Sequence, residues 1–268
     1  MTRRRAYADT PFGQVHYAEE GAGTAIVMLH QAPRSLDEFA EVQRELVPEF
    51  RTIAVDMPGF GASYHVPAPQ TIESMSRGVI ALLDSLNIEN AVLLGHHTGA
   101  AVALDVAATE PERVGVLALS SMPWLGPERR ARDHSVGLDI VERREDGSHL
   151  MKLWSLRQPH YPAGRPDLLD RFMHDALVPG LDPAEGHRAC DRYVMEERIG
   201  LVRCPTLVLT GGADPFAAPA VPHILDGLTG AACVEQVTID TAMIPAMEQR
   251  PETVAHHVRE FVNRVRAR

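Results

Sequence analysis

Cysteine is scarce in this sequence, and its few copies have no metal-like spacing. Cys190, Cys204 and Cys233 lie far apart among 268 residues, so no C-x-x-C pair of a zinc site is present. No two histidines have the H-x-x-x-H spacing that places metal ligands on one helix face. The basic segment MTRRRAYADT lacks the apolar core of a secretory signal. We therefore expect reduced thiols, no bound metal and a cytoplasmic location.

Long apolar runs, nucleotide-binding glycine motifs and an excess of positive charge are absent as well. No segment approaches the roughly 18 uninterrupted apolar residues of a membrane span. No G-x-G-x-x-G or P-loop pattern occurs, so no nucleotide cofactor is expected. The net charge of −10 argues against nucleic-acid binding. The expected partner is a small-molecule substrate, with neither a membrane nor a nucleic acid, and the sequence leaves a homodimer open.

Short apolar runs alternate with helical patterns over most of the chain. A hairpin is predicted over Arg5 to Glu19, around the turn Thr10-Pro11-Phe12-Gly13. Short apolar runs predict buried strands at 25–29, 51–55, 114–119 and 205–209, and a last strand is predicted at 233–239. Caps and helical periodicity predict helices at 36–46, 72–86, 100–108 and 251–265. This alternation is typical of an α/β protein with a doubly wound, mostly parallel sheet.

Residues 123–198 interrupt the alternation. They contain no convincing strand, but helix-like pieces run from Arg129 to Arg144 and from Pro166 to Ala176. A chain of 268 residues is long enough for one large α/β domain with an insertion. We expect a core domain of residues 1–122 and 199–268, with 123–198 forming a helical cap over the carboxyl edge of the sheet.

The segment AVLLGHHTG, residues 91–99, predicts a strand, a sharp turn and a helix. The apolar strand stops at Gly95, and Gly99 opens an alanine-rich helix. Glycine is expected where the backbone turns tightly or packs closely. In the related G-x-S-x-G nucleophile elbow the middle residue is a serine nucleophile. Here the middle residue is His97.

Four motifs, in this order, resemble the α/β-hydrolase superfamily: MLHQAP, DMPGFGAS, GHHTG and LVLTGGADP. The resemblance covers nearly the whole chain and is to the capped lipases, esterases and C–C hydrolases. It implies a mostly parallel, eight-stranded sheet flanked by helices, with an inserted helical cap. It also implies the chain order nucleophile, acid, base for the catalytic residues.

Position by position, the resemblance places His97 at the nucleophile and Asp214 at the acid. The backbone N–H groups of Ala32 and Thr98 then correspond to the oxyanion hole. The base is usually a histidine after the last strand, but Met243 stands there. Ordinary serine-esterase chemistry is therefore not expected.

We interpret His97 and Asp214 as a general-base dyad in a cofactor-independent enzyme. The expected reaction is hydrolysis of a small apolar ester, lactone or activated C–C bond. In an alternative, His97 removes a substrate proton in a lyase, isomerase or cofactor-free oxygenase. Direct nucleophilic attack by His97 is a further option. The remaining alternative is a non-catalytic protein that binds a small ligand.

Four polar residues near these motifs are candidate supporting residues. His96 is expected to pack under the strand ends, and His30 to brace the oxyanion loop. Gln31 either contacts a ligand oxygen or braces the loop. Arg34 either clamps a substrate anion or forms a surface ion pair, and the surface pair is favoured.

Apolar and aromatic residues in and before the cap are candidates for a substrate pocket. Met122, Trp124, Trp154 and Tyr161 either line that pocket or form the core of the cap. Most of the cap histidines are expected on solvated faces; they are His134, His149, His160, His174 and His187.

Overall fold

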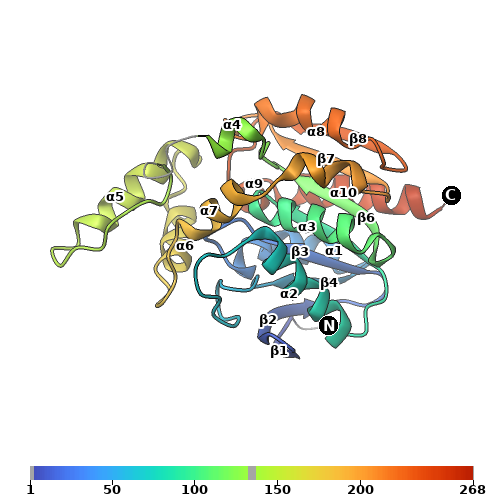
Figure 1. The fold of residues 1–268 in the computed structure, drawn as a ribbon, viewed down its shortest axis with the longest axis horizontal. Helices are drawn as coiled ribbons and strands as arrows, with labels where there is room; N and C mark the ends of the chain where they lie inside the picture. Colours follow the sequence, from blue (N-terminus) through green and yellow to red (C-terminus); the bar gives the residue numbers. More distant parts are fainter. Residues whose placement is uncertain (1–2, 132–136, 268) are drawn as a thin grey trace.

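The computed structural model describes residues 3–131 and 137–267. Within them, eight strands form one sheet in the order β1-β2-β4-β3-β5-β6-β7-β8 (Figure 1). The strands are β1 (Arg4–Thr10), β2 (Gly13–Glu20), β3 (Ala25–Leu29), β4 (Arg51–Val55), β5 (Ala91–His96), β6 (Val114–Ser120), β7 (Thr206–Gly211) and β8 (Val234–Ile239). The predicted α/β class and the mostly parallel, eight-stranded sheet are confirmed.

The direction of each strand follows from its connection to the next. β1 and β2 form the predicted hairpin, in which Thr10 pairs with Gly13, and β2 runs antiparallel to β4. The other neighbouring pairs are parallel, because helical crossovers join their strands. Strands β3, β5 and β7 are buried along their whole length, as their continuous apolar runs predict.

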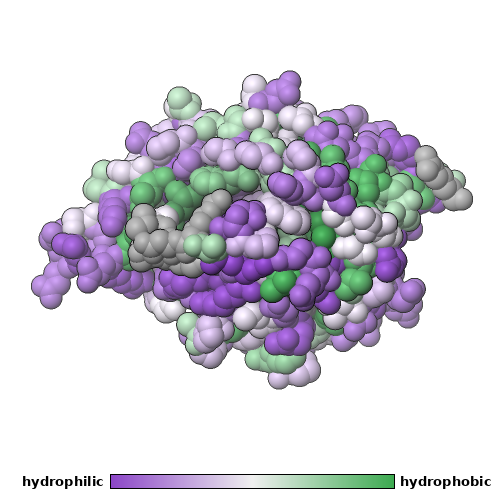
Figure 2. Space-filling view, turned by 45° about the horizontal axis from the view of Figure 1, so that its top comes forward, coloured by the Kyte–Doolittle hydropathy of each residue, from purple (hydrophilic) through white to green (hydrophobic). Residues whose placement is uncertain are grey.

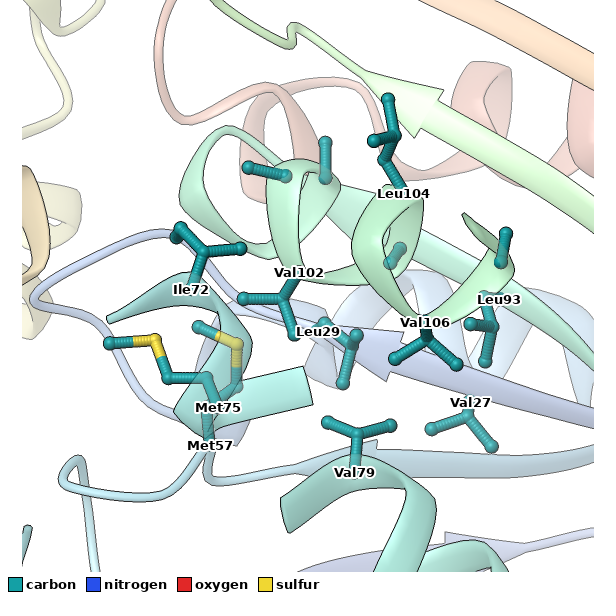
Figure 3. Packing of buried hydrophobic residues seen from close by; sticks show 14 of the residues in the cluster. Val27, Leu29, Met57, Ile72, Met75, Val79, Leu93, Val102, Leu104 and Val106 are labelled. Atoms are coloured by element: carbon teal, nitrogen blue, oxygen red, sulfur yellow. The ribbon is translucent and has the colours of Figure 1, made fainter. Parts of the chain in front are cut away.

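Helices cover both faces of the sheet and bury two separate apolar clusters. On one face, α2 (Ile72–Ser85) and α3 (Thr98–Thr109) pack on β3 and β5. In Figure 3, Val79, Val102 and Leu29 lie close together in this layer. On the other face, α1 (Ala40–Leu46), α9 (Ala246–Gln249) and α10 (Pro251–Arg266) pack on the sheet. α8 (Val221–Gly227) joins the first cluster.

Short 3-10 helices connect the larger elements. They are η1 (Leu36–Phe39), η2 (Pro111–Arg113), η3 (Gln158–His160), η4 (Met195–Glu197), η5 (Ile199–Leu201) and η6 (Ala218–Ala220). In the described part of the chain, no helix has the length and apolarity to cross a membrane. Hydrophilic residues cover much of the face drawn in Figure 2, and hydrophobic residues form separate patches between them.

The chain between β6 and η5 carries four α-helices among its described residues. They are α4 (Pro127–Arg130), α5 (Ser148–Arg157), α6 (Pro166–Ala176) and α7 (Glu185–Arg192). We call residues 123–198 the cap segment. Its α5 extends away from the sheet at the left of Figure 1. A small apolar cluster centred on Leu153, Leu168 and Phe172 holds α5 and α6 together.

The helix predicted from Arg129 to Arg144 is wrong. α4 ends at Arg130, and the described residues 137–147 are not helical, while 132–136 lie outside the described residues. The sequence VERREDG at 141–147 has no apolar face that could pack on a core. The helix predicted from Pro166 to Ala176 has the bounds of α6, because its apolar residues recur on one face.

Arg34 is fully buried, so the surface ion pair predicted for it is wrong. Its Nε donates to Asp175 Oδ2 of α6 at 2.8 Å, and its Nη1 donates to Glu248 Oε2 of α9 at 2.9 Å. Glu38 lies 3.9 Å away. These partners are 141 and 214 residues distant in sequence, which is why no local pattern indicated them. Arg34 therefore ties the loop after β3 to both the cap segment and α9.

Three buried carboxyl groups thus share the charge of Arg34, and one of them has a strongly altered pKa. Burial raises the pKa of Glu248 to about 7, and Glu38 adds to the rise, although Arg34 and Arg171 oppose it. The folded protein therefore binds one more proton than the unfolded chain between pH 4.5, the ordinary pKa of a glutamate, and about 7. Stability linked to Glu248 must fall as the pH rises through this interval.

We expect Glu248→Gln to remove this part of the pH dependence of stability. The free energy of unfolding of the unaltered protein, minus that of the variant, should fall by about 2–3 kcal/mol between pH 5 and pH 8. Urea unfolding at several pH values measures this difference. Glu252→Gln, at an exposed position of α10, is the control and should leave the slope unchanged. Parallel curves for the protein and Glu248→Gln would contradict the assignment.

Candidate active site

The turn between β5 and α3 holds His97 in a strained backbone conformation. β5 ends at His96 and α3 begins at Thr98, so His97 alone makes the turn, with φ 49° and ψ −113°. The flanking glycines allow the helix to approach the sheet. A Cβ at Gly99 would lie 2.0 Å from the Leu29 carbonyl oxygen, and one at Gly95 would lie 2.2 Å from the Gly99 oxygen. Only glycine fits these two positions.

His97 forms a short hydrogen bond with Asp214. His97 Nε2 lies 2.6 Å from Asp214 Oδ2, although 117 residues separate the two in sequence. Asp214 follows β7 and is fully buried, while the His97 side chain is 12% exposed. Asp214 Oδ1 accepts the N–H groups of Phe216 at 2.9 Å and Ala217 at 3.2 Å. The backbone therefore fixes the carboxylate, which in turn fixes the imidazole ring.

The charge of Asp214 determines which nitrogen of His97 carries the proton. Burial alone would raise the pKa of Asp214, but the charge and hydrogen bond of His97 and the N–H of Phe216 lower it to about 2. Asp214 is thus an acceptor at neutral pH, and we assign a proton to His97 Nε2, the nitrogen that faces it. When the ring carries only this proton, Nδ1 is the other nitrogen. Nδ1 then keeps its lone pair, and it has no hydrogen-bond partner among the described residues.

Two residues whose backbone N–H groups are candidate oxyanion donors line the same cavity as His97. Thr98 is the first residue of α3, so its N–H has no acceptor within the helix. Ala32 lies in the loop after β3. Together with His97, these residues line a cavity of about 190 Å³. The structure thus brings all four residues expected at the reaction centre to one edge of the sheet.

The loop that carries Ala32 is braced by His30 and Gln31. His30 Nδ1 donates to the Gln31 carbonyl at 2.8 Å, and His30 Nε2 accepts the Met57 N–H at 3.0 Å. The backbone N–H and side-chain amide of Gln31 both donate to the buried Glu38, at 2.8 and 2.6 Å. Gln31 also lines the cavity, so one side chain braces the loop and faces the ligand space.

His96 is buried beneath the ends of the strands. Its Nδ1 lies 3.1 Å from Ser120 Oγ, and its Nε2 donates to the Ile244 carbonyl at 2.8 Å. Burial lowers the pKa of His96, which keeps the ring neutral. The ring therefore joins β5 and β6 to the loop after β8, and it does not line the cavity.

The other pocket candidates lie outside the cavity. Met122 is buried in the first core cluster, and Trp124 packs on that cluster and stacks on His223. Tyr161 is buried in the cap cluster, on which Trp154 packs. Met243 is half-buried, and its neighbour Ile244 lines the cavity instead. Their type suggested a pocket, but their tertiary contacts place Tyr161 and Trp154 in the cap cluster and Met122 and Trp124 in or against the main core cluster.

Sequence reasoning missed most of the cavity wall contributed by the cap segment. The apolar part of the wall is formed by Pro123, Leu138, Ile140, Ala184, Phe216 and Ile244. Its charged part is formed by Arg129, Arg157, His187, Arg188 and Asp191. The sequence predicts solvated faces for most of the cap histidines, but His187 lines the cavity and His160 is half-buried beside Phe216. His134 lies outside the described residues. A charged residue on a short helix carries no local signal that its side chain faces a cavity.

Comparison with known proteins identifies the family. The sequence model of the alpha/beta hydrolase fold family matches residues 24–139. A haloalkane dehalogenase from Agrobacterium fabrum is 36% identical, over 97% of this chain and 92% of that protein. The chain belongs to the α/β-hydrolase fold family.

Two other relatives have similar identity but align with a smaller share of their own length. A dihydrolipoyllysine-residue acetyltransferase component of an acetoin cleaving system from Pseudomonas putida is 38% identical, over 72% of this chain and 52% of its own length. A 2-hydroxy-6-oxo-6-phenylhexa-2,4-dienoate hydrolase from Comamonas testosteroni is 31% identical, over 60% of this chain and 54% of its own length. The chain thus spans about half the length of these two relatives.

Solved structures share the fold at low identity. The enol-lactonase from Burkholderia xenovorans LB400 superposes with a TM-score of 0.77 and 22% identity, over 96% of this chain and 100% of that chain. A hydrolase from Pseudomonas aeruginosa PA01 gives a TM-score of 0.79 and 22% identity, over 97% of this chain and 98% of that chain. At this identity the likeness supports the fold alone.

The strain at His97 can be measured with two variants that both remove the imidazole. We expect His97→Gly to be more stable than His97→Ala by about 1 kcal/mol, because alanine retains a Cβ at positive φ and glycine does not. Urea unfolding measures the difference. Ala103→Gly, in the interior of α3, is the control and should lose roughly 1 kcal/mol relative to alanine. An alanine variant as stable as the glycine variant would show that the turn is unstrained.

Proposed function

We propose that this chain is a cofactor-independent hydrolase of small acyl compounds, which uses a His97–Asp214 general-base dyad in place of a Ser-His-Asp triad. Its substrates are esters, lactones or compounds with an activated C–C bond. The observation that carries the proposal is the 2.6 Å bond between His97 Nε2 and Asp214 Oδ2, since His97 lines a cavity together with Ala32 and Thr98.

The proposed reaction begins with a water molecule beside His97. Nδ1 accepts a proton from this water as the oxygen attacks the carbonyl carbon, and the ring becomes a cation. Asp214, which stays ionised above its pKa of about 2, stabilises that cation through Nε2–H. The electron pair of the carbonyl moves to oxygen, where the N–H groups of Ala32 and Thr98 receive it. As the bond to the leaving group breaks, Nδ1 returns the proton to that group.

The position of the acting nitrogen distinguishes this arrangement from the usual triad. In a Ser-His-Asp triad the aspartate holds Nδ1 and the histidine acts through Nε2. Here Asp214 holds Nε2, so the basic nitrogen is Nδ1, which lies nearer the backbone of the turn. The proposed base therefore acts on a water bound close to the N-terminus of α3.

The comparisons support the class of reaction more than the dyad. Relatives include proteins named as a haloalkane dehalogenase and a 2-hydroxy-6-oxo-6-phenylhexa-2,4-dienoate hydrolase, and structural neighbours include an enol-lactonase. The proposal transfers the hydrolytic class to this chain and assigns the attack to water rather than to a side chain.

Replacement of either dyad residue should abolish most turnover. We expect His97→Gln and Asp214→Asn each to lower kcat/KM by about 10²–10⁴-fold on a small ester or lactone, because each removes general-base catalysis. The measurement is hydrolysis of short-chain 4-nitrophenyl esters and γ-lactones. His256→Gln, at an exposed site on α10, is the control. Turnover that survives His97→Gln would exclude the dyad.

A covalent intermediate should not form on the turn. The chain has no serine at this position, so a fluorophosphonate probe is expected to leave residues 91–109 unmodified. Acid quenching during turnover, followed by intact-mass measurement, should show only the unmodified protein. An acyl group on His97 would instead establish that this histidine is the nucleophile.

A further inference from the structure

The cap side of the cavity is rich in positive charge, although the whole chain carries a net charge of −10. Among the described residues of the cap segment, three arginines and a histidine line the cavity, against one carboxylate. These residues are Arg129, Arg157, His187, Arg188 and Asp191. The dyad and the two backbone N–H groups belong to the core of the fold, so the cavity has two chemically different ends.

Arg157 is the most deeply buried of these cations. It ends α5 and is 1% exposed. Its Nε donates to Asp139 Oδ1 at 2.7 Å, its Nη2 donates to Asp139 Oδ2, and its guanidinium carbon lies 4.6 Å from the centre of the Phe172 ring. One edge of the guanidinium is therefore filled, and its plane is fixed.

The other edge of the Arg157 guanidinium has free donor capacity. Nη1 has no hydrogen-bond acceptor among the described residues. It is also not among their side-chain polar atoms that are both buried and without a partner. Since Arg157 lines the cavity, its two Nη1 hydrogens are available to a ligand. Nη1 and Nη2 form a fork on the side away from Asp139, where Nη2 also lies 3.4 Å from His187 Nε2. His187 lies beside this fork, with its Nε2 donating to Asp139 Oδ2 at 2.7 Å.

Arg129 offers a second set of donors on α4. Its Nε donates to Asp191 Oδ1 at 2.6 Å, whereas Nη1 and Nη2 have no acceptor in the described part of the chain. The Arg129 side chain is 20% exposed, so it is largely buried but remains accessible to a ligand. The third cation, Arg188, is bound to Glu185 and Asp182, and its charge is therefore largely neutralised.

We infer that the cavity takes an acyl compound that carries an ionised carboxylate, which Arg157 and Arg129 bind at the cap end while the scissile carbonyl lies against His97. This inference rests on the proposed function for the position of the carbonyl. Planar, bidentate pairing with a carboxylate is the interaction for which a guanidinium fork is suited. The apolar side chains of Leu138, Ile140 and Phe216 line the same cavity and suit a short hydrocarbon spacer between the two groups.

The pairing of Arg157 with Asp139 explains how such a cation persists in the cavity without ligand. Burial alone would raise the pKa of Asp139, but Arg157 and His187 lower it to about 2, so it stays ionised. Asp139 is itself fully buried, and its φ of 67° places it in the left-handed region. The carboxylate thus holds Arg157 by one edge and leaves the other edge for substrate.

The test is a binding experiment with the hydrolytically blocked variant His97→Gln. Calorimetry at low ionic strength would compare monomethyl glutarate, an anion, with dimethyl glutarate, its neutral analogue of similar shape. We expect the anion to bind at least ~10-fold more tightly. We also expect Arg129→Gln to reduce this preference severalfold and Arg157→Lys to reduce it ~10-fold, since lysine keeps the charge but loses the fork.

Two further variants guard against effects on folding. The double variant Arg157→Gln, Asp139→Asn removes both charges, so neither member of this pair is left as an unpaired ion. It should keep no more than the severalfold preference for the anion that Arg129 supplies. Arg165→Gln is the matched control, because Arg165 forms an exposed ion pair with Asp167 and does not line the cavity. Equal affinity for the two esters, or a preference that stays undiminished in all the Arg129 and Arg157 variants, would overturn the inference.

This design separates the two proposals. Preferential binding of the anion without hydrolysis of any ester by the unaltered protein would retain the carboxylate subsite and reject the hydrolase. Hydrolysis that depends on His97 but shows no preference for the anion would retain the hydrolase and reject the subsite.

Discussion

The close approach of α3 to the sheet is the constraint on which the site depends. Gly95 and Gly99 let the helix begin almost in contact with the Leu29 carbonyl, and His97 takes up the turn at positive φ. Because parallel strands end at one edge of the sheet, the first residue of α3 lies at the edge where β3 and β7 also end. Ala32 and Thr98 therefore line one cavity with His97, and Asp214 is hydrogen-bonded to His97 at the same edge. A larger residue at either glycine would push the helix outward and separate these groups.

Buried charge is the second organising feature, and in each case the backbone or a second ion compensates for it. Asp214 is held by two N–H groups and His97, and Asp139 by Arg157 and His187. A buried ion without such partners would cost several kcal/mol. Arg34 extends the same principle across the molecule, because its partners lie on α6 and α9. The cap segment is therefore joined to the core by directional polar contacts as well as by apolar packing.

The sequence predicted what depends on neighbouring residues and missed what depends on distant ones. The strands at 25–29 and 51–55 and the helix at 166–176 have their predicted bounds, because apolar periodicity is a local signal. The motif order led to the expectation that His97 and Asp214 meet, and they are hydrogen-bonded; their catalytic role remains a prediction. The burial of Arg34 and the arginines of the cavity depend on contacts across the chain. No periodicity encodes such contacts, so they required the structure.

An imidazole on the turn cannot simply replace one on the loop after β8. On the loop after β8, a histidine accepts the proton of a serine on the turn. On the turn, the histidine occupies the position of that serine. With Nε2 engaged by Asp214, the lone pair of Nδ1 and the N–H of Thr98 come from consecutive residues. Under the proposed mechanism, water and the carbonyl oxygen must then bind close together, and no acyl-enzyme divides the reaction into two easier steps. Such a site favours substrates whose carbonyl is already activated and whose leaving group departs readily. Lactones, activated esters and activated C–C bonds meet that requirement better than amides do.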